Sequence, residues 1–496
     1  MSRRRRFFIN GILLTVVGLS IRSVSLAFNS FITKAVGAEG IGLFTLIMNI
    51  YAFAITFATS GISLTVTRLT AEAQGEGRGS QCRKIMRNAV LYCLFFSVAA
   101  SLVTFLFAEQ FSVRFVGDDR GEIPLKILSF SLIPLSLSSA FGGYFVGVKR
   151  VGKNAFMQVL AQVFKIAVTL LCVFTFSGDS VSTVIALTLS ITLTEIFCFL
   201  VLFIEYVFDR RKNKGDGVRK ARFTDVTEMA LPLAFSAYIR SLLITLEHTL
   251  IPRGLYKRGE SVAEALASYG ILHGMVVPML LYPMAVLTSF AGLLVPEFAE
   301  SMARGERGRM SRLAGEALES TLAYATAASV IIYFFAEELG FVMYDSYEAG
   351  RYISLMSFVI PIMYLDHVAD SMLKGIGEHV YSMWVNIMDA ALSVLLVWFL
   401  IPRMGIGGYA LIIVIMEGFN FILSIGRLHR KIPFKVNFLR AFIFPLIAAI
   451  ISVAVSKSLF IMCGKEASAL WFFLKLLFAI CIFIAAYTLT KRRKTA

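Results

Sequence analysis

The chain has 496 residues, of which 57% are hydrophobic and only 16% are charged, and its mean hydropathy is +0.76. A soluble fold of this length would not tolerate so apolar a composition, so soluble enzymes and soluble binding proteins are excluded. The formal net charge is +16, but the basic residues are spread over many loops and are not gathered on one face, which argues against nucleic-acid binding. The composition therefore predicts a polytopic membrane protein.

Long apolar runs separated by short polar loops predict an all-α fold, because a helix needs about 20 apolar residues to cross the hydrocarbon core. We expect about fourteen such helices. They cover approximately residues 7–31, 41–66, 89–108, 124–147, 155–176, 182–208, 226–251, 266–295, 315–336, 352–373, 382–401, 406–426, 441–459 and 468–489. Lys and Arg are concentrated in alternate loops, so the positive-inside rule predicts that both termini are cytoplasmic.

The two halves of the chain resemble each other. Ala99–Ala100–Ser101–Leu102 matches Ala327–Ala328–Ser329–Val330, and Glu195 matches Glu417. We therefore expect two like-oriented six-helix repeats, an arrangement that transporters use when two bundles rock around a central site. The predicted domains are an N-terminal lobe (1–208), a basic cytoplasmic linker (209–223), a C-terminal lobe (224–430), and two additional helices with a basic tail (431–496).

Two arginines are predicted to lie deep in the membrane. Arg22 and Arg240 are near the middle of the first span of each repeat, where a charge costs about 3 kcal/mol on insertion scales. Such residues usually face a cavity, and their guanidinium groups suit an anionic ligand such as a phosphate. The alternative is a structural ion pair. Glu247 and His248 follow Arg240 by about two turns, either at the mouth of the cavity or at the membrane interface.

Lys165 is a third deep cation. It shares one helix face with Gln158 and Gln162, because these residues have the spacing i, i+4, i+7. A polar face on an apolar span normally turns inward, so Gln162 and Lys165 are candidates to line the cavity. Hydrogen bonding between helices is the alternative.

Carboxylates in the later spans are candidates for ion coupling. Asp366 and Asp370 are i, i+4 neighbours, although they lie close enough to the cytoplasmic end to be solvated. The other candidates are Asp389, Glu195 and Glu417. Each is suited to Na⁺ or H⁺, while Glu195 and Glu417 have packing as an alternative role, since they occupy equivalent places in the repeats. We expect no cofactor beyond the coupling ion and no metal site.

Catalysis is not expected. No nucleophile, base and orienting group occur together, and no nucleotide-binding GxxxxGK[ST] motif is present, so we predict that the protein is not an enzyme or an ATP-driven pump. Pro278 and Pro283 should kink the span at 266–295 and make it a candidate gate. His273 in the same span is expected to be a packed, hydrogen-bonded histidine.

Three motifs resemble a known family. They are Gly37–Phe44 (GAEGIGLF), Arg68–Gln74 (RLTAEAQ) and Leu294–Glu297 (LVPE). Nearly the whole chain resembles the stage V sporulation protein B-like polysaccharide transporters of the multidrug, oligosaccharidyl-lipid and polysaccharide flippase superfamily, to which lipid II flippases are related. The resemblance implies two lobes around a cationic cavity, with Arg22 in it, and a lipid-tail groove formed by the C-terminal helices. Where those relatives carry an Arg–Asp pair, this chain has Phe28–Asn29.

We therefore expect a multi-pass flippase of the bacterial cytoplasmic membrane. It would move an undecaprenyl-linked, pyrophosphate-bearing saccharide or peptidoglycan precursor by alternating access, in sporulation, cell-wall or exopolysaccharide synthesis. Arg22, Arg240 and Lys165 would hold the phosphate. The expected partners are the lipid-linked sugar and membrane lipids, and no nucleic acid. The alternatives are a cation-coupled exporter of drugs or metabolites with the same fold, and a non-transporting scaffold for envelope-synthesis enzymes.

Overall fold

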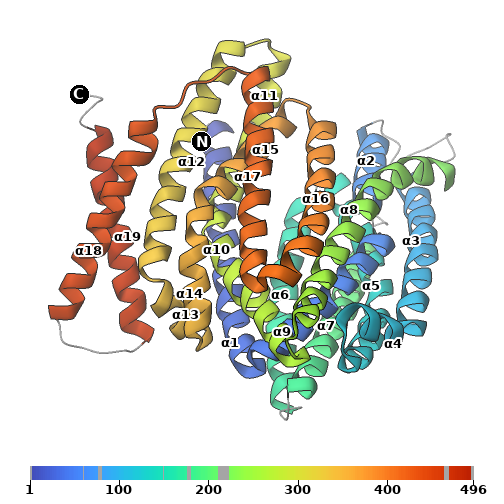
Figure 1. Ribbon diagram of the computed structural model, residues 1–496. Helices are drawn as coiled ribbons and strands as arrows, with labels where there is room; N and C mark the ends of the chain where they lie inside the picture. Colours follow the sequence, from blue (N-terminus) through green and yellow to red (C-terminus); the bar gives the residue numbers. More distant parts are fainter. Residues whose placement is uncertain are drawn as a thin grey trace. The chain divides into compact units, whose positions relative to one another are not determined.

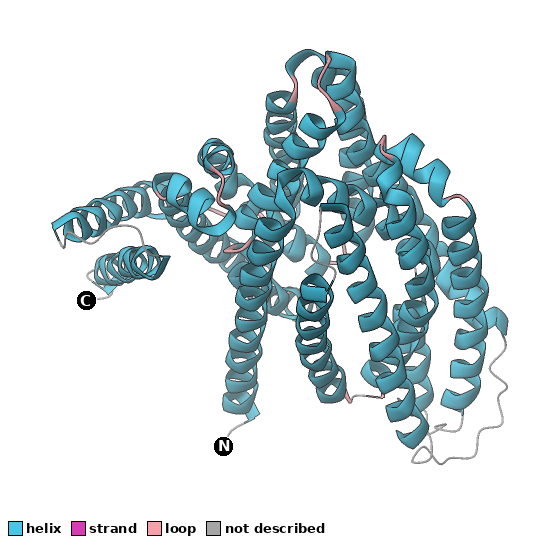
Figure 2. Ribbon diagram, turned by 90° about the horizontal axis from the view of Figure 1, so that it is seen from below, coloured by secondary structure: helices cyan, strands magenta, loops and turns pink. Residues whose placement is uncertain are grey.

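The computed structural model describes residues 3–59, 61–75, 81–148, 150–175, 180–209, 223–462 and 469–492. Within these ranges every regular element is a helix (Figures 1 and 2). Twelve helical segments of the described chain are long and apolar enough to cross a membrane, and Val159–Thr175 is a shorter apolar helix. The prediction of an all-α polytopic membrane protein is confirmed. The count of about fourteen spans and the side of the termini stay predictions.

Contacts divide the chain into two compact units. The N-unit comprises Ala35–Gly270 and Val394–Gly405, and the C-unit comprises Met1–Lys34, Ile271–Ser393 and Ile406–Ala496. The lobes predicted at 1–208 and 224–430 rest on the sequence repeat and stay a prediction. The predicted linker at 209–223 lies outside the described residues, apart from its two ends.

The N-unit has a core to which six of its described helices contribute. Buried side chains of α2, α3, α5, α6, α7 and the start of α8 form this core, including Ile62, Tyr92, Phe141, Met157 and Val226. Its elements are the second part of α1 (Arg3–Thr59), α2 (Ile62–Gly75), α3 (Gln81–Leu106), α4 (Ala108–Phe111), η1 (Ser112–Val116), η2 (Asp119–Gly121), α5 (Glu122–Gly147), α6 (Val151–Thr175), α7 (Ser180–Asp209), α8 (Phe223–Arg258), α9 (Val262–Gly270) and the end of α16 (His379–Met404).

In the C-unit, α12 and α15 are central: α15 packs against α11, α12 and α17, and α18 packs on α12. The elements are the first part of α1, η3 (Ile271–Val276), α10 (Val277–Leu281), α11 (Met284–Ala303), α12 (Arg307–Phe334), α13 (Ala336–Tyr344), α14 (Tyr347–Met356), η4 (Ser357–Val359), α15 (Ile360–Gly375), most of α16, α17 (Ile406–Lys431), η5 (Leu439–Ile443), α18 (Phe444–Met462) and α19 (Ala469–Arg492).

The first two predicted spans, 7–31 and 41–66, are not separated by a loop. The two helical parts of α1 meet directly at a kink at Gly37, which has a non-helical backbone conformation with a positive φ of 79° that favours glycine. Gly42 then lets α1 approach the backbone of α9 at Leu266 and Gly270, and Glu39 forms a 2.7 Å ion pair with Arg120. The GAEGIGLF motif thus encodes a kink and a close helix crossing.

The span predicted at 266–295 is interrupted, as its prolines indicated. It consists of α9, the π-helix η3, the short α10 with Pro278 in its first turn, and α11, which begins after Pro283. The predicted kinks are confirmed. Whether this segment acts as a gate stays a prediction.

Candidate functional site

Arg240, one of the predicted ligand-binding cations, belongs to the N-unit. It lies near the middle of the candidate span Val226–Arg258, and its side chain is exposed. Within the part of the chain that is described, no hydrogen bond or ion pair reaches its guanidinium group. A charge at this depth is costly unless water or a ligand meets it. Arg240 is therefore available to an anionic ligand.

A hydrogen-bonded network lies about two turns further along α8. The hydroxyl group of the fully buried Tyr269 is 3.0 Å from Nδ1 of His248 and accepts a 2.9 Å hydrogen bond from Nδ2 of Asn49. Thr245 Oγ1 donates to the carbonyl oxygen of Asn49 at 3.3 Å. Glu247 interacts electrostatically with Tyr269. His248 is thus held by Tyr269 of α9, which Asn49 of α1 holds in turn, and sequence patterns gave no signal for either contact.

An apolar pocket of about 320 Å³ lies beside the same stretch of α8. Phe53 and Phe57 of α1, Phe115 of η1, and Leu242 and Thr245 of α8 are among the residues that line it, together with small residues of α3. The lining is almost entirely apolar. Leu242 follows Arg240 by two positions, so the two side chains leave α8 in different directions, and Arg240 is not among the residues that line the pocket.

Lys165 and Glu195 are brought together by the packing of α6 on α7. Both side chains are half-buried, and their charges interact. Gln162 lies one turn before Lys165 on α6 and has a polar partner of its own. Glu195 therefore carries a charge opposite to that of Lys165 and close enough to interact with it. The ion-coupling and packing roles considered for Glu195 stay predictions.

The side chain of Arg22 lies outside the described residues, so its predicted contact with a ligand stays a prediction. Its neighbours on α1 are held within the C-unit. Ser23 Oγ is 2.7 Å from the Tyr282 hydroxyl group, and Asn29 Nδ2 donates to the carbonyl oxygen of Gly274 in the π-helix at 3.3 Å. Asn29 therefore has a structural contact within the C-unit.

Four of the predicted ion-coupling carboxylates lie in the C-unit, and three of them form a cluster. Asp366 of α15 and Asp389 of α16 both interact electrostatically with Glu417 of α17. Asn420 Nδ2 donates to Asp389 Oδ1 at 3.0 Å. Oδ1 of Asp366 and Oδ1 of Asn420 are buried and accept no hydrogen bond within the described chain. Two buried oxygens without a donor are typical of a site that a cation or a proton completes.

Asp370 differs from the other three. Lys374, one turn later on α15, forms a 2.6 Å ion pair with it, and Ser382 Oγ donates to it at 2.5 Å. Its charge is therefore matched locally, and an i, i+4 salt bridge was the signal in the sequence that could have shown this. No group of three or more His, Cys, Asp or Glu side chains among the described residues is arranged to hold a metal ion.

The packed role expected for His273 is confirmed. Its Nε2 is 2.8 Å from the hydroxyl group of Tyr409, and the two rings lie 5.1 Å apart.

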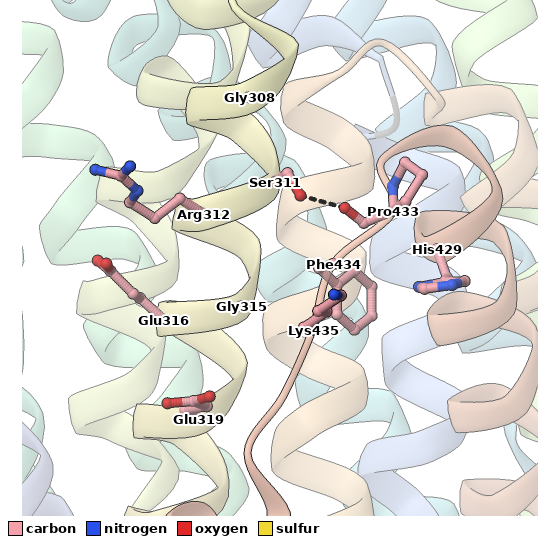
Figure 3. A pocket seen from close by; sticks show the side chains of 10 residues that line it. All are labelled: Gly308, Ser311, Arg312, Gly315, Glu316, Glu319, His429, Pro433, Phe434 and Lys435. Atoms are coloured by element: carbon pink, nitrogen blue, oxygen red, sulfur yellow. Dashed lines mark hydrogen bonds between the residues drawn. The ribbon is translucent and has the colours of Figure 1, made fainter.

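A second pocket, of about 580 Å³, belongs to the C-unit and lies between α12 and the segment at 432–437, which we call the strap (Figure 3). Ser311 Oγ donates to the carbonyl oxygen of Pro433, and Glu319 Oε1 accepts a 2.7 Å hydrogen bond from the Asn437 backbone N–H. The pocket is lined by both basic and acidic side chains, among them Arg312, Glu316 and Glu319 of α12 and Lys435 of the strap. None of the predicted site residues lines it. The strap anchors the start of α18 to α12.

Three comparisons place the chain among known proteins. Stage V sporulation protein B of Bacillus subtilis (strain 168) is 24% identical over 476 residues, which cover 94% of this chain and 90% of that protein. The lipid II flippase MurJ of the same strain is 22% identical over 455 residues, which cover 85% and 82%. A solved structure of the lipid II flippase MurJ in an inward closed conformation has a TM-score of 0.68 at 13% identity, covering 96% of this chain and 99% of that chain.

The family pattern described as polysaccharide biosynthesis protein matches residues 8–302, which is more than half of the chain. The similarity to stage V sporulation protein B and to lipid II flippases confirms the resemblance inferred from the motifs. This multi-pass bacterial membrane protein belongs to the polysaccharide biosynthesis protein family.

Proposed function

We propose that the protein is a flippase for a lipid-linked, anionic saccharide, specifically an undecaprenyl-linked pyrophosphate saccharide or a peptidoglycan precursor, which it moves across the cytoplasmic membrane by alternating access. The observation that carries the proposal is the exposed and unpaired guanidinium of Arg240 at mid-span. Its fork of donors matches two phosphate oxygens at once. In a membrane interior, such a contact offsets the cost of the charge on both partners.

The N-unit offers both kinds of surface that an amphipathic ligand needs. A lipid-linked sugar phosphate has a charged head joined to a long hydrocarbon chain. Along α8 the exposed Arg240 lies on one face, and Leu242 and Thr245 on another face line a cavity of aromatic and aliphatic groups. The relatives support the same class, because one of them is a lipid II flippase. They do not identify the saccharide.

We further propose that the Asp366, Asp389 and Glu417 cluster carries the coupling ion, Na⁺ or H⁺; a proton needs no rearrangement, whereas Na⁺ would require these side chains to move, since as they lie in the described structure they are not arranged to hold a metal ion. Three neighbouring carboxylates inside a membrane protein are costly without a compensating positive charge. Asp370 already has Lys374, whereas the cluster has buried oxygens of Asp366 and Asn420 that accept no donor in the described chain. A bound cation or protons would supply what these oxygens lack.

The carboxylate cluster also supports a second candidate, a cation-coupled exporter of drugs or metabolites with the same fold. The two functions differ in the charge of the ligand. A flippase for phosphate-bearing lipids needs Arg240, while an exporter of organic cations would work as well or better without it.

The proposed function is tested by reconstituting the purified protein in liposomes with a fluorescent undecaprenyl-pyrophosphate saccharide and measuring how fast the label becomes accessible to an external quencher. Arg240→Ala should slow flipping by a factor on the order of ten to a hundred, because a charge-assisted contact is lost. Arg22→Ala should do the same. The matched control is Arg258→Ala, which removes an exposed cation at the C-terminal end of α8 that does not line the apolar pocket and should flip at the wild-type rate.

Full flipping by correctly inserted Arg240→Ala and Arg22→Ala protein would refute the phosphate-binding role. The scaffold alternative would be favoured by two results together: the wild-type protein does not flip the lipid, and a host that carries either variant grows normally. Depletion of the protein in its host should make one lipid-linked sugar accumulate on the inner leaflet, which identifies the substrate.

A further inference from the structure

A third pocket, in the N-unit, lies away from all predicted site residues. It is a groove of about 610 Å³ between α3, α5 and α7, and its polar residues are Arg83 and Arg87. These arginines are one turn apart on one face of α3 and both are exposed. The rest of the groove is lined by Met86 and Val90 of α3 and by three aromatic residues, Phe141, Phe203 and Tyr206.

The two guanidinium groups have no acidic partner among the described residues. The first turn of α3 contains no acidic residue. On α7, Glu205 has an interaction of its own, and Asp209 is buried and already bound by Arg150 and by the Tyr144 hydroxyl group at 3.0 Å. The groove therefore presents two uncompensated positive charges at one end of an aromatic surface.

The aromatic part of the groove is preformed. Phe141 packs edge-to-face against Phe203 with ring centroids 5.9 Å apart, and it lies 5.1 Å from the ring of Tyr206. Phe141 is buried, whereas Phe203 remains 43% exposed. The exposed face of α3 continues from the groove with apolar side chains such as Leu91 and Phe95, which are 52% and 70% exposed. In a membrane protein such a face contacts lipid chains.

The depth of the arginines agrees with a lipid head group. Arg83 and Arg87 precede the apolar run that begins near residue 89, so they lie at the level where a span meets the polar interface. The distribution of Lys and Arg predicts that this end of α3 is cytoplasmic, which is the side where basic pockets between membrane helices recognise anionic lipids. The groove volume is also within the range of roughly 300–1,000 Å³ seen for small-molecule sites.

We propose that this groove binds an anionic phospholipid, with the phosphate held by Arg83 and Arg87 and the acyl chains lying against Phe203 and the exposed face of α3. Two guanidinium groups spaced by one helical turn can each donate two hydrogen bonds to phosphate oxygens. A soluble anion would use the arginines but not the aromatic surface, and an uncharged lipid would use the surface but not the arginines. The proposal goes beyond the flippase function and does not depend on it.

Binding is tested by native mass spectrometry of the full-length protein in detergent, titrated with dioleoylphosphatidylglycerol or, separately, dioleoylphosphatidylcholine. The wild type should bind the anionic lipid more tightly by a factor on the order of ten. The double variant Arg83→Gln with Arg87→Gln should lose this preference. Lys84→Gln is the matched control, because Lys84 is exposed on the same turn of α3 but does not line the groove, so it should bind like the wild type.

A second pair of variants separates the two parts of the site. Arg83→Lys with Arg87→Lys keeps the charge but not the fork of donors and should weaken binding only in part, which also provides a folded variant if the double Gln protein is unstable. Phe203→Ala should weaken binding of the long-chain lipid. Inorganic phosphate should neither bind at comparable concentration nor compete.

The proposal is overturned if the folded double Gln variant binds phosphatidylglycerol as the wild type does, if Lys84→Gln loses as much affinity, or if inorganic phosphate competes as well as the lipid. Capture of a protein partner by this face with no lipid preference would also overturn it. Because the readout is lipid binding and not flipping, its failure is distinct from failure of the proposed function.

Discussion

Gly315 of α12 gives a sharp test of how α18 and α19 are anchored (Figure 3). A Cβ atom at this position would lie 2.7 Å from the carbonyl oxygen of Lys435 in the strap. Since carbon–oxygen contacts are normally no closer than about 3.3 Å, the strap would have to move by roughly half an ångström. Ser311 and Glu319 hold the strap through Pro433 and Asn437 on either side of that contact, so it cannot simply move away.

The expected cost of Gly315→Ala is therefore that of overpacking, about 1–3 kcal/mol. Alanine is also a better helix former than glycine by about 0.5–1 kcal/mol, and this gain would partly hide the steric cost of Gly315→Ala. Gly308→Ala is the matched control, because Gly308 is in the same helix and lines the same pocket but has no atom within 4 Å of an added Cβ. The difference between the two variants isolates the steric cost.

The measurement is thermal unfolding of the purified proteins in detergent, followed by the fluorescence of the three tryptophans, one of which, Trp471, is on α19. Gly315→Ala should unfold roughly 1–3 °C below Gly308→Ala, since the entropy of unfolding scales with chain length. Gly315→Leu should lower the midpoint further. If Gly315→Ala is as stable as Gly308→Ala, the strap does not press on α12 as the structure indicates, and the anchoring argument is wrong.

Three further predictions concern other parts of the chain. Lys431 and Arg427 each form a 2.7 Å ion pair with Glu378 and hold its pKa below the usual range. The ion pairs should therefore contribute their full stability above about pH 4.3, and this contribution should be lost as the pH falls through the lower pKa of the folded state. Unfolding midpoints of the wild type and Glu378→Gln at several pH values measure it, because the difference between the two proteins should disappear at low pH. Gly42→Ala should destabilise the α1–α9 crossing by about 1–3 kcal/mol, measured against Gly292→Ala, whose Cβ meets no atom within 4 Å. Asp389→Asn should abolish the ion dependence of flipping while Asp370→Asn, whose charge is paired with Lys374, preserves it; the opposite pattern would refute the assignment of the coupling site.

Much of the candidate site was predictable as a set of residues, but its pairings were not. Arg240 was identified because a charge near the middle of an apolar run is unusual whatever the fold. The partners of the other charges come from distant segments, as with Lys165 and Glu195 or with Asp389 and Asn420. Only the Asp370–Lys374 pair was within reach of sequence reasoning, since it is a local i, i+4 contact.

The sequence by itself determined three properties: the protein is an all-α membrane protein, certain segments are apolar enough to span the membrane, and the chain belongs to its family. These properties follow from local composition, because each span must satisfy its own backbone hydrogen bonds in the bilayer. Only the tertiary structure decided that α1 is kinked at Gly37 and that Asp366, Asp389 and Glu417 lie together. It also decided that Arg83 and Arg87 line an aromatic groove without an acidic partner among the described residues. Those features depend on which helix faces meet, and hydrophobicity alone does not distinguish one apolar face from another.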